Sequence, residues 1–439
     1  MDLLEKEITD WSAAEISQSI KNDKVTCKEV IQRFIDHIDI IEDKFHAFEH
    51  YSKELLLEKA IEKDKKEEKN GLLFGVPFGV KDIFNSKDFY TEMGSPIWKG
   101  FQAGNNARVV DQLLWEGALM AGKTVTAEFA VHEPGKTINH LDSKRITGTS
   151  SSGSAVAVAT GMVPLALGTQ TAGSTIRPAS YCGVIGMKPS FGSVPRTGIL
   201  KTLDTLDHVC FFSKTVNDLK LIFDSCRVKG TNHPFSGGPI EEKKIEQQYR
   251  VAFVKTSVWD FAQDDTQKKV KEFVSVLSKE PDINLKEVEL PNSLNNIHQQ
   301  HELIYEKALS YYFAEEYSKN PDKISSGFKN MVERGKKTSI KDFQEALKEQ
   351  VKSINTFDQF IKDFDIVVSL SVAGEAPLLS NPIEPKDPCL IWTYLHAPSV
   401  SLPLLQGPNG LPVGLQFVSS RYNDFFLQNF CDLLMKRFK

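Results

Sequence analysis

The chain has 439 residues, with 53 Lys and Arg against 58 Asp and Glu, which gives a formal net charge of −5. Both signs are mixed along it, and 41% of the residues are hydrophobic, as in an ordinary globular protein. This balance excludes a dedicated nucleic-acid binder, because such a protein carries a basic patch for the phosphates. No run reaches the roughly 18 apolar residues of a membrane span, and no basic and then apolar leader opens the chain. We therefore expect a cytoplasmic protein without nucleic-acid or membrane partners.

The cysteines are scattered, without a C-x-x-C pair and without a histidine at zinc-ligand spacing. In a cytosolic chain of this length such cysteines are typically free and buried. We therefore expect no disulfide framework and no metal site. The cysteines are Cys27, Cys182, Cys210, Cys226, Cys389 and Cys431.

Two helix starts are encoded near the beginning of the chain. Ser12 and Thr26 are each followed three residues later by a glutamate, which is the pattern of a capping box. They predict helices that begin near residues 13 and 27, the second with an apolar stripe from Val30 to Ile41. We expect residues 1–70 to form N-terminal helices that wrap the core.

From Gly71 onward, short apolar runs broken by Gly and Pro alternate with helix-like segments, which is typical of a layered α/β fold. Residues 231–364 carry long polar stretches, and we expect a peripheral helical segment there that can border the active site. The predicted strands cover residues 76–80, 164–169, 184–187, 251–254, 365–370, 399–403 and 413–418, and the predicted helices cover 108–121, 214–226, 266–279 and 425–436.

Two clusters of small residues differ from the rest of the chain: 147–155 (T-G-T-S-S-S-G-S-A) and 168–179 (G-T-Q-T-A-G-S-T-I-R-P-A). Backbone N–H groups can converge on one point only where the chain turns sharply without bulky side chains, and such a nest binds an anion. Phosphate binding and the oxyanion hole of acyl transfer both use such nests. Neither cluster contains the phosphate-binding motif G-x-x-x-x-G-K-[ST] or G-x-G-x-x-G, so acyl transfer remains for these clusters.

Acyl transfer needs a nucleophile and a base. The hydroxyl of Ser174 and the N–H groups of Thr171, Ala172, Gly173 and Ser174 itself can face one carbonyl group. No histidine lies in either cluster and G-x-S-x-G is absent, so a Ser-His-Asp triad has no local support. A buried neutral lysine can act as the base instead, and Lys81 ends an apolar strand candidate.

Several segments resemble the amidase signature family, in one order over most of the chain, from about residue 71 to 436. Carried over by position, the resemblance implies that Ser174 is the acylated nucleophile, that Ser150 is a bridging serine preceded by a cis peptide bond, and that Lys81 is the base. It also implies the fold of that family, one compact domain over residues 1–439 with a large mixed sheet covered by helices on both faces. The segments are 75–82 (G-V-P-F-G-V-K-D), 122–130 (G-K-T-V-T-A-E-F-A), the two small-residue clusters, 181–189 (Y-C-G-V-I-G-M-K-P) and 411–416 (L-P-V-G-L-Q).

The second cluster departs from the family's usual D-T-G-G-S-I-R-x-P. Gln170 stands for Asp, Ala172 for Gly, and Arg177 lies one place later than the family's arginine. The spacing from serine to proline is preserved, and Ala172 still presents its N–H group if its φ is negative. In the first cluster Thr147, Thr149 and Ser152 stand where the family more often has Pro, Gly and Gly.

The resemblance implies hydrolysis of a small-molecule carboxamide to an acid plus ammonia or an amine through an acyl-enzyme. Thr171, Ala172 and Gly173 would form the oxyanion site, and no metal or organic cofactor is required. A homodimer would fit the habit of the family. Two alternatives stay open: the glutamine-hydrolysing subunit of a tRNA amidotransferase, and a catalytically silent amidase-like binding protein.

Overall fold

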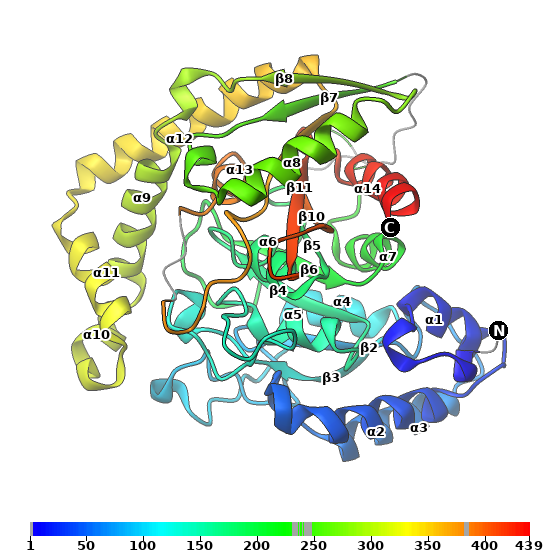
Figure 1. The fold of residues 1–439 in the computed structure, drawn as a ribbon. Helices are drawn as coiled ribbons and strands as arrows, with labels where there is room; N and C mark the ends of the chain where they lie inside the picture. Colours follow the sequence, from blue (N-terminus) through cyan, green and yellow to red (C-terminus); the bar gives the residue numbers. More distant parts are fainter. Residues whose placement is uncertain (1–2, 231–235, 237, 239, 241–247, 382–385) are drawn as a thin grey trace.

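A computed structural model describes the chain except for residues 1–2, 231–235, 237, 239, 241–247 and 382–385. The described residues contain a single mixed sheet of eleven strands in the order β1-β3-β2-β4-β6-β5-β10-β11-β9-β7-β8, as Figure 1 shows in part. The strands are β1 (Phe48–Tyr51), β2 (Pro77–Lys81), β3 (Leu119–Thr124), β4 (Leu165–Gln170), β5 (Ile185–Lys188), β6 (His208–Ser213), β7 (Tyr249–Val254), β8 (Ile283–Val288), β9 (Ile366–Leu370), β10 (Ser399–Gln406) and β11 (Pro412–Val418).

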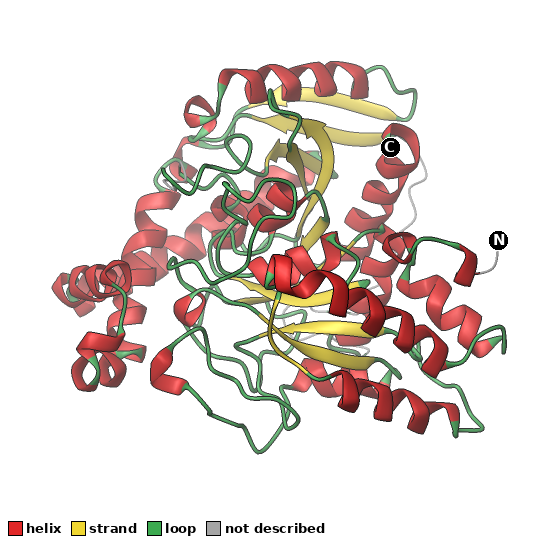
Figure 2. Cartoon of the chain, turned by 60° about the horizontal axis from the view of Figure 1, so that its bottom comes forward, coloured by secondary structure: helices red, strands yellow, loops and turns green. Residues whose placement is uncertain are grey.

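Helices surround the strands, which run through the middle of the molecule (Figure 2). The fold is therefore α/β with a large mixed sheet, as expected. The helices are α1 (Ala13–Lys21), α2 (Cys27–Phe45), α3 (Lys53–Asp64), α4 (Arg108–Trp115), α5 (Ser152–Ala159), α6 (Ile176–Cys182), α7 (Val216–Cys226), α8 (Asp264–Leu277), α9 (Ile297–Tyr312), α10 (Ala314–Lys319), α11 (Ser326–Lys337), α12 (Ile340–Phe360), α13 (Leu390–Tyr394) and α14 (Asp424–Phe438).

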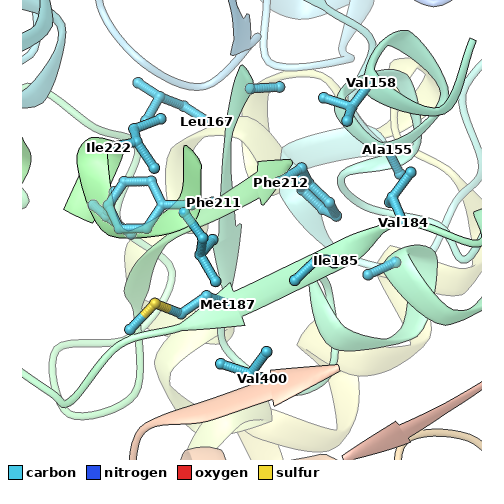
Figure 3. Packing of buried hydrophobic residues seen from close by; sticks show 14 of the residues in the cluster. Ala155, Val158, Leu167, Val184, Ile185, Met187, Phe211, Phe212, Ile222 and Val400 are labelled. Atoms are coloured by element: carbon cyan, nitrogen blue, oxygen red, sulfur yellow. The ribbon is translucent and has the colours of Figure 1, made fainter. Parts of the chain in front are cut away.

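The core lies on both faces of β6, because successive strand residues point to opposite faces. Phe212 lies on the side of Ala155 in α5, whereas Phe211 lies on the side of Ile222 in α7 (Figure 3). Helix α6 packs beside α5, and α4 and α14 pack against α7. The sheet is thus covered on both faces, and the two small-residue clusters lead into α5 and α6, which pack together on one of them.

The N-terminal helices begin where the sequence predicts. Both capping boxes are formed, at Ser12 for α1 and at Thr26 for α2. The segment also supplies a strand that was not predicted, since β1 pairs antiparallel with β3 at the edge of the sheet.

One predicted helix is too long. The segment 108–121 contains α4, which ends at Trp115, and then the first residues of β3. Gly117, with a φ of +88°, turns the chain between the two, because glycine adopts this conformation without steric cost. Strands β6 and β8 were also not predicted.

The segment 231–364 contains β7 and β8 in addition to its helices, of which α9, α10 and α11 form a group at the left of Figure 1. Among the described residues, no helix combines the length and the hydrophobicity of a membrane span.

Candidate active site

The sheet brings Lys81 and the second small-residue cluster to one edge. Strands β2 and β4 are parallel neighbours, with Val80 beside Leu167. Because the carboxyl ends of parallel strands lie at the same edge, Lys81 at the end of β2 meets Thr169 and Gln170 at the end of β4.

The Lys81 amine is buried among hydroxyl groups. Its Nζ donates to Ser150 Oγ at 2.6 Å, to Ser151 Oγ at 3.0 Å and to Thr169 Oγ1 at 2.9 Å. No carboxylate of a described residue forms an ion pair with it. Burial lowers the pKa of Lys81 to about 7, although Cys210 and Asp207 oppose the shift. A substantial share of this amine is therefore neutral near neutral pH and can accept a proton.

Ser150 lies at a sharp turn just before α5. The expected cis peptide bond is absent, since the described residues contain none. The chain turns here through Gly148 and Thr149, whose φ angles are +95° and +72°. Thr126 Oγ1 donates to the carbonyl of Ser150 at 3.0 Å and fixes the main chain of the turn. The Ser150 hydroxyl is thereby held against Lys81.

Gln170 anchors the turn that carries Ser174. Its Oε1 accepts from the N–H groups of Thr175 and Ile176, both at 2.9 Å, at the start of α6. Its Nε2 donates to Thr393 Oγ1 at 2.9 Å, and this hydroxyl donates to the carbonyl of Ala172 at 2.7 Å. The neutral amide of Gln170 thus both accepts and donates hydrogen bonds at the position where the amidase signature family usually has an aspartate.

The four consecutive N–H groups of Thr171, Ala172, Gly173 and Ser174, in which we expect the nest, donate to no described residue. Ala172 is not among the residues with positive φ, so its departure from glycine leaves its N–H in place. A Cβ at Gly173 would lie 1.9 Å from Asp387 Oδ2, so a larger residue there would require the Asp387 side chain to shift. Such a row of N–H groups suits a developing oxyanion.

Ser174 lies between β4 and α6 and is 7% exposed. Its Oγ forms no hydrogen bond with a described residue, including Ser150 and Lys81. The structure therefore brings Lys81 and Ser150 into direct contact, and it places Ser174 in the adjoining turn with a free hydroxyl.

A cavity of about 960 Å³ adjoins the nest and is lined by Thr149, Ala172 and Arg177. Residues of helices α9 and α11, which lie within segment 231–364, also line it. Burial lowers the pKa of the lining histidines: His132 and His301 to about 4, and His298 in the same direction. These rings are neutral at neutral pH, so the histidines add no charge to the cavity.

Two ion pairs are among the groups that line the cavity. Arg177 Nη2 lies 3.4 Å from Asp387 Oδ2, and Arg334 Nε donates to both carboxylate oxygens of Glu306 at 2.8 and 3.0 Å. The displaced arginine of the family motif thus faces the cavity. Cys182 has a pKa that burial raises to about 12, so it is an inert packing residue.

Sequence reasoning missed Ser151 and Thr169 as partners of Lys81. Both lie inside the small-residue clusters, so the sequence indicated that they belong to the site but not that they contact Lys81. His298 and His301 were also missed, although their spacing of three places them on one face of a helix.

With this geometry in view, comparisons with known proteins decide the family. The Amidase family model matches residues 29–427, which is most of the chain. This chain belongs to the amidase family.

Known amidase-family proteins cover nearly the whole of the chain. A glutamyl-tRNA(Gln) amidotransferase subunit of Staphylococcus carnosus (strain TM300) is 27% identical over 94% of each chain. The native peptide amidase of Stenotrophomonas maltophilia superposes with a TM-score of 0.84 and 20% identity, covering 98% of this chain and 97% of that one. A 6-aminohexanoate cyclic dimer hydrolase complexed with substrate gives a TM-score of 0.87 and 19% identity, covering 99% and 98%. The fold is shared with amide hydrolases, and the family supports a hydrolase acting on carbon–nitrogen bonds.

Proposed function

We propose that this amidase hydrolyses a small-molecule carboxamide to its acid plus ammonia or an amine through a Ser-Ser-Lys acyl-enzyme mechanism. The observation that carries the proposal is the buried Lys81 amine, which faces three hydroxyls and no carboxylate. A lysine in such a place is useful as a proton acceptor, whereas a structural buried lysine needs a counter-charge.

The first half of the reaction acylates Ser174. Neutral Lys81 takes the proton of Ser150 while Ser150 takes that of Ser174, and the Ser174 Oγ bonds to the amide carbon. The N–H groups of residues 171–174 hold the resulting oxyanion. As the carbon–nitrogen bond breaks, the proton returns from Lys81 through Ser150 to the nitrogen, which leaves as ammonia or an amine.

The second half releases the acid. Water attacks the acyl carbon, and its proton passes through Ser150 to Lys81. The bond to Ser174 Oγ then breaks, and the same proton returns to that oxygen. Ser150 is needed as a relay because Lys81 contacts Ser150 but not Ser174.

Hydrolysis of glutamine for a partner enzyme is the second candidate, since the relatives named above include one chain of an amidotransferase. The two functions differ in their requirement for other chains. Ammonia release from glutamine that needs a co-purifying partner chain would favour this candidate, whereas turnover of simple amides by the isolated chain would favour the first.

The test is the labelling of the protein with a fluorophosphonate, which reacts with activated serines, followed by intact-mass measurement and peptide mapping. We expect one adduct on Ser174, none in Ser174→Ala, and slow labelling in Lys81→Ala. An amide panel with an ammonia readout then identifies substrates. A folded protein that takes up no adduct would contradict the simple hydrolase and favour a silent binding protein or a site completed by a partner.

A further inference from the structure

The nucleophile turn is held at its first residue by a side chain that the mechanism above does not use. We propose that Asp207 is a positioning residue, which fixes Thr171 at the start of the oxyanion nest and places a negative charge beside the Lys81 pocket. The proposal rests on the proposed Ser-Ser-Lys function.

Sheet register explains why these residues meet. Strand β6 is antiparallel to β4, and His208 pairs with Gln170. Asp207, one residue before His208, therefore lies opposite Thr171, one residue after Gln170.

The hydrogen bonds make Asp207 the centre of this corner. Its Oδ1 accepts from Thr171 Oγ1 at 2.7 Å and from Thr202 Oγ1 at 2.6 Å. Its Oδ2 accepts from the N–H groups of Thr202 and Leu203, both at 2.9 Å. On the other side of the turn, His301 Nε2 donates to the carbonyl of Thr171 at 2.9 Å. Thr171 is thus clamped through its side chain and its main chain, so its N–H has one direction.

Asp207 is also connected to the base. It lines a small cavity of about 120 Å³ together with Thr171 and Thr169, and Thr169 Oγ1 accepts from Lys81 Nζ at 2.9 Å. The negative charge of Asp207 favours the protonated amine, although burial of Lys81 is the larger influence. Asp207 thereby helps to keep the pKa of Lys81 from falling below about 7.

Other charged and titratable groups surround this corner. Arg196 donates to the main-chain carbonyl of Asp207 at 3.1 Å rather than to its carboxylate. Burial keeps His208 neutral by lowering its pKa and keeps Cys210 in β6 and Tyr305 in α9 protonated by raising theirs. The remaining charged side chains that line the small cavity are those of Lys201 and Asp204.

The experiment measures the second-order rate of fluorophosphonate labelling of Ser174 between pH 5 and 10, which needs no known substrate. In the wild type we expect this rate to rise with the neutral fraction of Lys81, through a pH of about 7. In Asp207→Asn the rising limb should move about half a unit to lower pH, because the charge that favours the ammonium is gone. The plateau should also fall roughly tenfold, because the turn loses its clamp.

Two matched variants separate charge from position. Thr171→Val keeps the carboxylate but removes the hydroxyl that it holds, so the plateau should fall while the limb stays in place. Asp204→Asn removes an exposed carboxylate of the same loop that bonds to Tyr312 rather than to Thr171, so neither the plateau nor the limb should change. If Asp207→Asn does not fold, Asp207→Glu is measured instead. It keeps the charge but shifts the carboxylate, so the rising limb should stay in place while the plateau rate falls.

The outcomes distinguish this inference from the proposed function. A wild type that takes no label overturns both. Two results overturn the role of Asp207 alone when the wild type is labelled. One is a rising limb of the pH profile that stays in place in Asp207→Asn, and the other is a plateau rate that does not fall in Thr171→Val. A limb that moves in Asp207→Glu, where the charge is kept, also overturns it.

Discussion

Two buried lysines on neighbouring strands show how partners decide what a buried amine can do. Lys81 ends β2 and lies beside Thr124 of β3, which follows Lys123. Both lysines are 0% exposed. Lys123 Nζ lies 2.8 Å from Asp82 Oδ1 and also donates to the carbonyl of Phe84 at 2.8 Å. The Lys81 amine has hydroxyl partners instead.

The difference separates structure from chemistry. A carboxylate beside Lys123 stabilises its ammonium in the interior, and main-chain donors at residues 92 and 93 in turn satisfy Asp82. Hydroxyls can accept from an ammonium and donate to an amine, so the Lys81 pocket accommodates both protonation states. Equal burial therefore gives a structural ion pair in one case and a candidate base in the other.

The sharpest test within the Lys81 pocket compares two adjacent serines. Ser150 Oγ has Lys81 as its bonding partner, whereas Ser151 Oγ also donates to the main-chain carbonyl of Thr169 at 3.3 Å. We expect Ser150→Ala to slow fluorophosphonate labelling about 10³-fold, because the proton relay is lost. Ser151→Ala should slow labelling less than about tenfold, since the Ser151 hydroxyl also bonds to the main chain of β4. Equal losses in the two variants would contradict the relay.

Breaking the Lys123 pair should affect stability rather than chemistry. Lys123→Met leaves Asp82 buried without its counter-charge, and we expect a loss of about 3–5 kcal/mol in the free energy of unfolding. Lys81→Met should cost much less, because no buried charge is left behind. Urea denaturation at pH 7 measures both.

The double variant Lys123→Met/Asp82→Leu supplies the control for this test. It should recover part of the loss, because it removes both charges. If Lys81→Met and Lys123→Met destabilise the protein equally, the distinction between the two lysines is wrong.

The sequence predicts the parts of this site that depend on local pattern. Lys81 follows an apolar strand, and the two clusters are recognisable by their small residues. The capping boxes at Ser12 and Thr26 are equally local, and both form. These features could be predicted because each depends on neighbours within a few residues.

Contacts that depend on sheet register could not be predicted. Asp207 meets Thr171 only because β6 pairs antiparallel with β4, and β6 was not recognised as a strand. β3 was partly assigned to a helix because its residues are buried on both faces and do not alternate in polarity. The contact of Asp387 with Arg177 joins residues far apart in the chain, which no local pattern shows.

The pH dependence of stability should also differ between the wild type and Lys81→Met. The pKa of Lys81 is about 7 when folded and near its ordinary value of 10.5 when unfolded. Between these pH values the unfolded chain binds more protons than the folded chain. As the pH rises, the free energy of unfolding of the wild type should therefore increase, relative to that of Lys81→Met, by up to about 1 kcal/mol per pH unit. Below pH 7 the difference should level off. Unfolding midpoints of both proteins from pH 6 to 10 test this, and parallel curves would contradict the low pKa.

The smallest expected effect comes from making the Lys81 region more like that of Lys123. Gln170→Glu keeps an acceptor for the N–H groups of Thr175 and Ile176 but removes the donor to Thr393. It also adds a carboxylate one residue after Thr169. We expect labelling to slow by about three- to tenfold, because Thr393 turns toward the new carboxylate and releases the carbonyl of Ala172.

The rising limb of the labelling rate should at the same time move to higher pH by less than about half a unit, because two N–H groups already neutralise much of the added charge. Thr393→Val breaks the same chain of hydrogen bonds without adding charge, so it should slow labelling equally and leave the limb in place. Since both changes remove one connection to Ala172, the double variant should be no slower than the slower single variant. Additive losses would mean that Gln170 and Thr393 act separately, and a limb that moves to lower pH would mean that the new carboxylate does not act on Lys81.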